Sequence, residues 1–380
     1  MSLLERIFDK FSLLLDPDPE AESQPEPAKS STPADDSTQV IAKPAPGLET
    51  LSRSDETYRT DAATDDPAKW WNYSGASEAE LAASDDSPCE YFTADNIIEC
   101  LDRQLKAGET PVFTIPSSIM EALALLEKKD FEYSQVAAVI EKNPTLTGIF
   151  LSSINSSFYN RGFAITELRT ALSRLGKNNI RALLQLYSIK VSFANDELFG
   201  KVAGNVITHS YATAVIASYL SQRYYPEPGL AFLAGLLHDI GKLGILKTVS
   251  MESEFIVRLK NRIDESMFDR IFNERHSQVG VILGKSWNMD RMTLAAIERH
   301  HHVWDYSFEE ADQLDYQLCM LICLSDKIAR IIGYGRPIGS INLFLDPAAI
   351  ELNLEKNAGS VEFLDPIPEV VRYKVADCRF

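Results

Sequence analysis

Histidine, a side chain well suited to bind a transition metal, is confined to one part of this 380-residue chain. No histidine occurs before residue 209 or after residue 302. The candidate ligands are five of the six histidines and two aspartates: His209, His238, Asp239, His276, His300, His301 and Asp326. Histidine nitrogen and carboxylate oxygen together suit Fe, Mn, Zn or Ni, and a carboxylate can bridge two ions. The sequence therefore predicts a site for one or two divalent transition-metal ions.

Each candidate ligand also has a simpler explanation. A lone His209 on an apolar helix would more often be a hydrogen-bonded core residue, and Asp326 could form a surface ion pair with Arg330. The spacing of His209 from the later His-Asp pair, and the apolar residues around Asp326, favour a metal site instead. His302 is the member of its run least expected to bind, because neighbours on a helix face different directions.

Helices must position these ligands, because apolar residues recur at helical spacing from residue 93 to about residue 335 and no strand-like alternation competes. The helices expected to carry the outer ligands are 202–224, with His209, and 317–332, with Asp326. Between them, a core helix is expected to end at Gly241 and to present His238 and Asp239 to a pocket. A helix end is also expected at Gly176. The predicted fold is all-α, a compact multi-helix bundle.

Charge divides the chain into an acidic N-terminal part and a nearly balanced remainder. Residues 1–90 hold 20 Asp and Glu against 7 Lys and Arg, which is −13 of the net charge of −18. Residues 16–92 are rich in Pro, Ser, Asp and Glu, so they are expected to form a disordered, self-repelling tether. The expected layout is a helix over 1–15, this tether over 16–92, a helical domain over 93–335 and a C-terminal appendage over 336–380.

The first fifteen residues combine an apolar helical face with a charged opposite face. Leu4, Phe8 and Phe11 lie on the apolar face, which would dock on a signalling protein or touch a membrane surface peripherally. The alternative is a helix that packs back on the domain. The segment from Trp70 to Tyr73 is a second candidate contact point within the tether.

Other function classes are not expected. Nucleic-acid binding would need a dense Lys/Arg cluster, and none is visible. The five cysteines form no Cys-x-x-Cys pair and no secretory signal peptide is recognisable, so a reduced, cytoplasmic location is expected. The longest apolar run, near residues 229–237, is shorter than the about 20 residues that a membrane-spanning helix needs.

The order His…His-Asp…Asp resembles the HD superfamily of metal-dependent phosphohydrolases. Residues 110–330 are more narrowly similar to an HDOD domain, the HD-related output domain of bacterial signalling proteins. The segments that carry this resemblance are Ile115-Pro116, the stretch from Ile140 to Leu146 with Asn143-Pro144, Ile154-Asn155-Ser156, and Ala171-Leu172 with Leu175-Gly176. The resemblance implies an HD-type helical bundle with a role in signal transduction.

The extra histidines are similar to a related branch, the HD-GYP phosphodiesterases. Arg275 to Gly280 resembles the Glu-His-Pro-x-x-Gly segment of that branch, and His300 to Asp305 resembles its His-His-Glu-x-Trp-Asp segment. The resemblance places His276, His300 and His301 at second-metal positions. The sequence departs from the branch at His302, where the branch has Glu, and the Gly-x-Gly-Tyr-Pro loop is replaced, so hydrolysis of cyclic di-GMP is not expected.

The resemblance implies two functions. In the first, the protein hydrolyses a nucleotide-like phosphoester or phosphodiester, with Asp239 bridging two ions that activate water and Lys242 stabilising charge on the phosphoryl group. In the second, the domain is an inactive scaffold that regulates by binding signalling partners.

Overall fold

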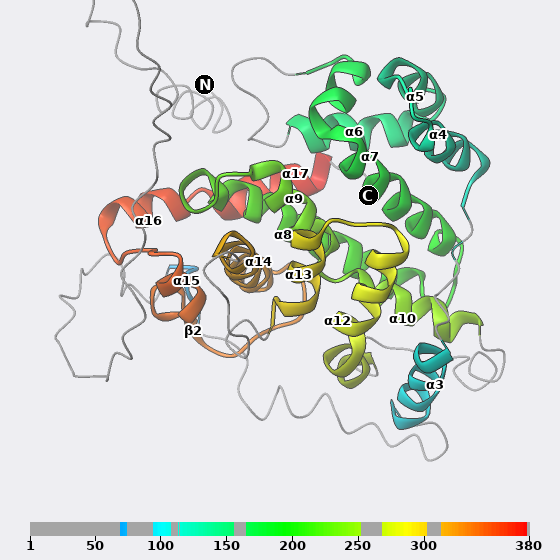
Figure 1. The fold of residues 1–380 in the computed structure, drawn as a ribbon. Coiled ribbons are helices and arrows are strands. Elements are labelled where there is room, and N and C mark those ends of the chain that lie inside the picture. Colours follow the sequence, from blue (N-terminus) through cyan, green and yellow to red (C-terminus); the bar gives the residue numbers. More distant parts are fainter. Residues whose placement is uncertain are drawn as a thin grey trace, which may run out of the picture. The chain divides into compact units, whose positions relative to one another are not determined.

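The computed structural model describes residues within the compact unit Arg59–Phe380. The described residues are 69–73, 94–107, 113, 115–155, 165–251, 268–301 and 313–377. Most of them are helical, and the strands among them, Asn72–Tyr73 (β1) and Ile341–Asn342 (β2), contain two residues each. The all-α fold predicted from helical spacing is confirmed (Figure 1).

The helices fall into three groups along the described chain. The first group is Ala94–Ala107 (α3), Ser117–Glu127 (α4), Tyr133–Ile140 (α5), Pro144–Asn155 (α6) and Leu168–Phe193 (α7). The second is Gly200–Tyr224 (α8), Pro228–Leu237 (α9), Ile240–Met251 (α10), Asp269–Ser286 (α12), Arg291–Arg299 (α13) and Gln313–Ile331 (α14). The third is the 3-10 turn Leu343–Leu345 (η5), Pro347–Glu351 (α15), Ala358–Leu364 (α16) and Ile367–Asp377 (α17).

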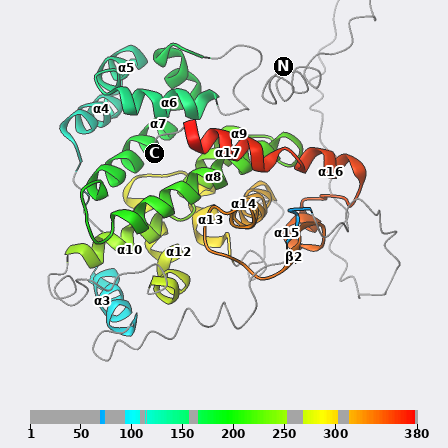
Figure 2. The same cartoon turned by 180° about the vertical axis from the view of Figure 1, so that it is seen from behind.

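Helix α8 is the central element of the second group. Every residue from His209 to Ser221 is buried, as expected for a helix whose side chains are small, apolar or aromatic on all faces. α9 and α14 lie along α8, and α7 and α17 also contact it (Figures 1 and 2). A ligand on α8 is therefore held in place by several neighbouring helices.

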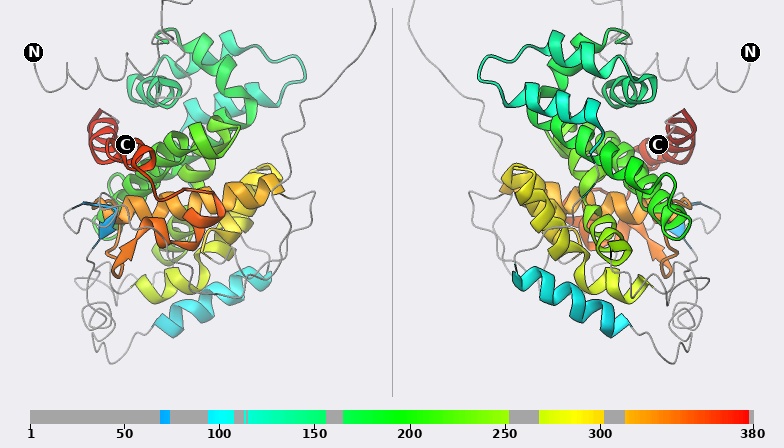
Figure 3. Two further views of the ribbon diagram at one scale, coloured as in Figure 1. Left: turned by 90° about the vertical axis from the view of Figure 1, so that its left-hand side faces the viewer. Right: turned by 90° about the vertical axis from the view of Figure 1, so that its right-hand side faces the viewer.

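The predicted break at Gly176 is confirmed and lies within α7. Gly176 has φ 78° and ψ 162°, a conformation that glycine adopts without steric cost, and it divides α7 into two helical pieces. α4, α5 and α6 contact α7, which in turn contacts α8 (Figure 3). The upstream helices thus join the central group through α7.

Helices α10 and α12 meet through direct backbone contact at Gly241. A Cβ atom on Gly241 would lie 1.8 Å from the carbonyl oxygen of His276 and 2.6 Å from the amide nitrogen of Gly280. The prediction that the core helix ends at Gly241 is wrong, because α9 already ends at Leu237 and α10 begins at Ile240. Gly241 permits helix packing and does not terminate a helix.

α9 and α10 together form a very apolar stretch of the described chain. By length and composition Pro228–Met251 could cross a membrane, but 83% of its most apolar window is buried inside the fold. The buried pair His238-Asp239 also interrupts the stretch. These helices therefore belong to the core of the bundle.

The segment 336–380, predicted as an appendage, packs into the same compact unit. α15 contacts α14, and α17 contacts α8. Lys327 of α14 donates to Asp346 at 2.6 Å, and Asp346 also caps the N-terminus of α15. The last described helices thus help to hold α14 in place.

An ordered segment at residues 69–73 interrupts the predicted tether. Trp71 is fully buried, its carbonyl oxygen accepts a hydrogen bond from Leu343 at 3.0 Å, and β1 pairs antiparallel with β2. The prediction that this cluster is a contact point in a disordered region is wrong for Trp71, because burial of a large indole outweighs the disorder that the composition favours. The predicted helix over 1–15 and the rest of the tether lie outside the described residues.

Candidate metal centre

Helices remote in sequence bring the seven predicted ligands to one place. His209 comes from α8, His238 and Asp239 from the turn between α9 and α10, His276 from α12, His300 and His301 from the end of α13, and Asp326 from α14. They surround the carboxylate of Asp239, which is 1% exposed. The structure therefore places every predicted ligand in one cluster, in which all but the half-buried His301 are buried.

One oxygen of Asp239, Oδ2, faces two histidines. The Nε2 atoms of His209 and His238 lie 3.5 and 3.4 Å from it. Asp326 joins this group, since its Oδ1 lies 2.9 Å from His209 Nε2 and 3.9 Å from His238 Nε2. We call His209, His238, Asp326 and the Oδ2 side of Asp239 the first half of the centre.

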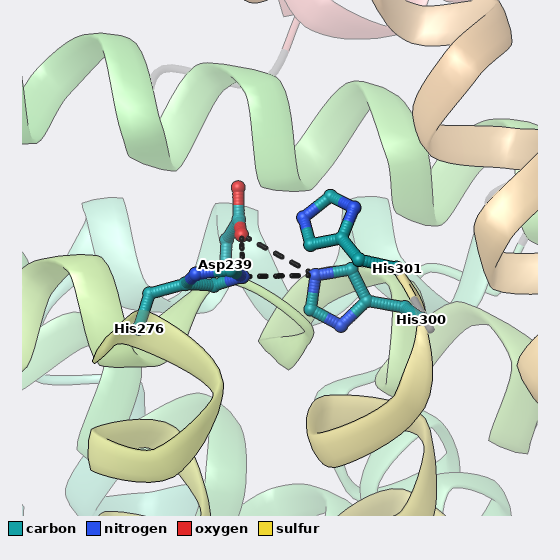
Figure 4. A group of neighbouring side chains, drawn as sticks. All are labelled: Asp239, His276, His300 and His301. Carbon is teal, nitrogen blue, oxygen red and sulfur yellow. Dashed lines mark hydrogen bonds and ion pairs between the residues drawn. The ribbon is translucent and has the colours of Figure 1, made fainter. Parts of the chain in front are cut away.

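The other oxygen, Oδ1, faces the remaining histidines. His276 Nε2 and His300 Nε2 lie 3.6 and 3.7 Å from it and 3.2 Å from each other, and Figure 4 shows these groups pointing toward one another. The ring of His301 lies 4.1 Å from that of His300 between centroids. We call His276, His300, His301 and the Oδ1 side of Asp239 the second half. Asp239 thus lies between two groups of ligands.

Backbone carbonyl groups hold four of the imidazole rings through Nδ1. The pairs are His209 with Tyr334 at 2.8 Å, His238 with Gly235 at 2.7 Å, His300 with Ile297 at 3.0 Å, and His276 with Phe272. A carbonyl oxygen can only accept, so each Nδ1 must donate. The hydrogen-bond network therefore assigns the tautomer whose Nε2 lone pair points to the centre, as in metal-binding histidines.

In this tautomer, each Nε2 atom is a hydrogen-bond acceptor, so acceptor atoms lie opposite one another in the centre. The lone pairs of His276 Nε2 and His300 Nε2 meet at 3.2 Å, although the Ser277 hydroxyl also lies 3.3 Å from the former. Burial lowers the pKa of His276 to about 3, so this ring carries no added proton at neutral pH. A metal ion bound between these ligands would resolve the conflict, because metal–ligand bonds of about 2.0–2.1 Å would place neighbouring ligand atoms about 3 to 3.5 Å apart, close to the spacings in both halves.

Two buried atoms of the centre have no hydrogen-bond partner among the described residues. They are His238 Nε2 in the first half and Asp239 Oδ1 in the second. A buried acceptor without a partner costs about 1–3 kcal/mol. A cation in each half would satisfy both atoms, so the residues present fit a divalent metal.

Neighbouring charges keep the two carboxylates ionised. Burial would raise the pKa of Asp239, but the ammonium group of Lys242 holds it well below its usual range. Burial likewise opposes ionisation of Asp326, and the guanidinium group of Arg330 lowers its pKa. Both groups are therefore anionic at neutral pH, the form that binds a cation.

Lys242, predicted to act on the substrate, lies at the edge of the first half. Its Nζ atom is 2.5 Å from Asp239 Oδ2, and its side chain is 21% exposed, whereas that of Asp239 is 1% exposed. The lysine therefore places a positive charge between the buried ligands and solvent.

Sequence reasoning missed the backbone groups that orient the ligands. The carbonyl of Tyr334 contacts a histidine 125 residues earlier in the chain, and no side-chain pattern indicates such a contact. The simpler explanation of Asp326 is correct in part, since Arg330 lies 3.7 Å away, but Asp326 is buried and not on the surface. His302 lies outside the described residues.

Comparison with known proteins indicates one family. A model of the HDOD domain matches residues 112–303. An uncharacterised protein from Treponema pallidum is 22% identical over 200 residues, which is 50% of this chain. The match spans 37% of the length of that relative.

Two solved structures are similar to this chain. One, from Shewanella amazonensis SB2B, bears the provisional name of metal-dependent phosphohydrolase; it is 18% identical, with a TM-score of 0.55 over 74% of this chain and 99% of that chain. An HDOD domain protein of unknown function from Geobacter sulfurreducens is 21% identical, with a TM-score of 0.47 over 74% of this chain and 97% of that chain. At such identity the first match shows a shared fold.

Proposed function

The chain belongs to the HDOD domain family, and from this premise we propose that it is a cytoplasmic signalling output protein whose divalent metal centre hydrolyses a nucleotide-like phosphoester or phosphodiester. The first half of the centre would hold one ion and the second half another, with Asp239 contributing one oxygen to each. Fe, Mn, Zn or Ni suits such a mixed nitrogen and oxygen ligand set.

The observation that carries the proposal is the convergence of Nε2 lone pairs on both oxygens of Asp239. A polar core held only by hydrogen bonds would pair donors with acceptors. Here His276 and His300 present two acceptors to each other, and His238 Nε2 has no described partner. Cations account for this arrangement in both halves.

The chain would contribute rigidity and charge to the reaction. When bound, divalent ions activate water and neutralise the oxygens of a phosphoryl group. Asp239 sets the separation of the two halves, and the backbone carbonyls keep the imidazoles in the binding orientation. Lys242 would stabilise negative charge that develops on the phosphoryl oxygens, because its ammonium group is fixed beside Asp239.

A second candidate function is a scaffold without catalysis. The observation that favours it is the burial of the centre: His209, His238, Asp239, His276, His300 and Asp326 are each 5% exposed or less. The metal would then stabilise the bundle. Partners would bind the HDOD surface or the N-terminal residues Leu4, Phe8 and Phe11, and loss of residues 1–15 should disrupt their recruitment.

Elemental analysis of the purified full chain tests the metal centre. Asp326→Asn and Asp315→Asn form a matched pair, because both carboxylates are buried on α14 but Asp315 pairs with Arg291 at 2.8 Å. We expect one or two transition-metal ions per chain in the wild type and in Asp315→Asn, and a loss of about one ion in Asp326→Asn. A wild-type protein that stays metal-free after incubation with Mn²⁺, Zn²⁺, Fe²⁺ or Ni²⁺ would contradict the proposal.

Hydrolysis decides between the two functions. The metal-loaded protein is assayed on bis(p-nitrophenyl) phosphate and on a panel of nucleotides, beside Lys242→Ala. We expect turnover by the wild type and a rate about 100-fold lower in Lys242→Ala, the usual cost of removing one group that stabilises developing charge. Bound metal without turnover of any phosphoester would support the scaffold.

A further inference from the structure

The turn that follows α14 reaches back to the metal centre. Within residues 333–337, the carbonyl oxygen of Tyr334 accepts the hydrogen bond from His209 Nδ1 at 2.8 Å. Gly335 comes next, with φ +121°, and a Cβ atom there would lie 2.7 Å from His209 Nδ1. Both the backbone conformation and the close approach to the imidazole require glycine at this position.

Arg330 fastens this turn to α14. Its Nε atom donates to the carbonyl of Arg336 at 3.0 Å, and its Nη2 atom donates to that of Pro337 at 3.5 Å. Its Nη1 atom lies 3.7 Å from Oδ2 of the ligand Asp326. One side chain therefore contacts a ligand and also holds the turn that orients another ligand.

The far side of the turn is fastened as well. The Arg336 side chain pairs with Asp269, the first residue of α12. Beyond the turn, β2 pairs with β1. The Tyr334 carbonyl is thus held in place by contacts that do not involve His209.

We propose that the 333–337 turn is a positioning element of the first half of the metal centre. Through the Tyr334 carbonyl it keeps His209 protonated on Nδ1, so that Nε2 is free to bind the ion beside Asp239 and Asp326. Gly335 permits the approach, and Arg330 holds the turn against the helix that carries Asp326. The role in metal binding rests on the proposed metal centre, whereas the effect on the His209 tautomer can be measured without metal.

The tautomer of His209 in metal-free protein is the first test. Gly335→Ala is compared with Gly333→Ala, because both glycines have positive φ, +121° and +91°, but nothing lies within 4 Å of a Cβ at 333. Long-range ¹H–¹⁵N spectra of ¹⁵N-histidine-labelled protein should show His209 protonated on Nδ1 in the wild type and in Gly333→Ala. Gly335→Ala should lose this signature, and a wild-type pattern in that variant would overturn the proposal.

Calorimetric titration with Co²⁺ is the second test. A lost hydrogen bond to a metal-binding histidine typically lowers metal affinity 10- to 100-fold. We expect that decrease at one site in Gly335→Ala, with the other site unchanged, and wild-type affinities in Gly333→Ala. A wild-type protein that binds no Co²⁺ would overturn the proposed metal centre. The tautomer measurement would then be the test of whether the 333–337 turn orients His209.

Arg330→Gln distinguishes the effect of releasing the 333–337 turn from the effect of removing the positive charge beside Asp326. It adds no atom at position 335, so it can be tested even if Gly335→Ala does not fold. Removal of a cation 3.7 Å from Asp326 should by Coulomb's law raise the affinity for Co²⁺. Release of the turn should lower it. We expect a net decrease, and an unchanged or raised affinity would overturn the proposal.

Discussion

The imidazole rings of the centre are oriented by backbone carbonyl groups, which do not titrate. Their Nδ1 hydrogen bonds therefore leave Nε2 as the ring atom that faces the centre. At that atom, a proton and a metal ion compete for the same lone pair. Acid should thus release a metal bound at these atoms before it disturbs the ring orientation.

His276 should make the stability of the metal-free protein depend on pH. Burial lowers its pKa from 6.5 to about 3, so between these values the unfolded chain binds a proton that the folded chain does not. The free energy of unfolding therefore has its full value, as far as His276 is concerned, above pH 6.5. It decreases as the pH falls toward 3, with a limiting slope of about 1.4 kcal/mol per pH unit for one proton. Urea unfolding of chelator-treated protein between pH 7.5 and 4.5 measures it.

His276→Gln is the control for this pH dependence, because it removes the titrating ring and retains a polar side chain. The free energy of unfolding of the variant should change less with pH than that of the wild type, by a slope that corresponds to about one proton. Burial also lowers the pKa of His301, so some slope should remain in the variant. Identical slopes in the two proteins would show that His276 does not titrate as expected.

Among the helices, contact between backbones decides how close the ligands come. Gly241 lets α10 touch the carbonyl of His276 on α12. Gly235 lets α9 approach the backbone of Ala214 on α8 so closely that a Cβ atom on Gly235 would lie 2.7 Å from the Cα atom of Ala214. These two glycines flank His238 and Asp239 in sequence. The central turn of the metal centre is therefore held between α8 and α12 by two positions that have no side chain.

Gly241→Ala should separate α10 from α12. Its Cβ would meet a backbone oxygen at 1.8 Å, and backbone cannot rotate away as a side chain can, so we expect a loss of about 3 kcal/mol in the free energy of unfolding. Gly204→Ala is the matched control, because Gly204 also lies in a helix and nothing is within 4 Å of a Cβ there. Urea unfolding should show that variant to be neutral or up to about 1 kcal/mol more stable.

The residues that cluster around Asp239 could be predicted from sequence because the type and spacing of histidine and aspartate indicate their chemistry. The helices that carry them could be predicted because burial imposes a period on the apolar residues. Gly241 does not end a helix as its place in the sequence predicts, because a glycine after an apolar helix usually marks the helix end and only the close approach of α12 shows its other role. The contact of the Tyr334 carbonyl with His209 could not be predicted, because every residue has a backbone carbonyl and the residue type does not indicate which one makes a contact.

The compact unit extends beyond the helical domain predicted from sequence. It runs from Arg59 to Phe380 and includes the segment 69–73 on one side and α15 to α17 on the other. β1 and β2 join these two parts, and β2 begins shortly after the 333–337 turn, whose Tyr334 carbonyl contacts His209. A pairing between residues about 270 positions apart in sequence thus closes the unit near the candidate metal centre.

Two N-terminal truncations should therefore behave differently, although both begin within the tether predicted over 16–92. A chain of residues 59–380 retains Trp71 and β1 and should unfold like the full chain, while losing any partner recruited through residues 1–15. A chain of residues 75–380 lacks the fully buried Trp71 indole, and removal of such a side chain costs about 3–5 kcal/mol. We expect that loss in urea unfolding, together with faster amide hydrogen exchange around Leu343, whose amide donates to Trp71.

The exposed ion pair of Lys69 with Asp365 should contribute little. Trp71→Ala in the full chain should reproduce the effect of the longer truncation. Equal stability of both truncations would mean that the segment 69–73 does not hold the unit together.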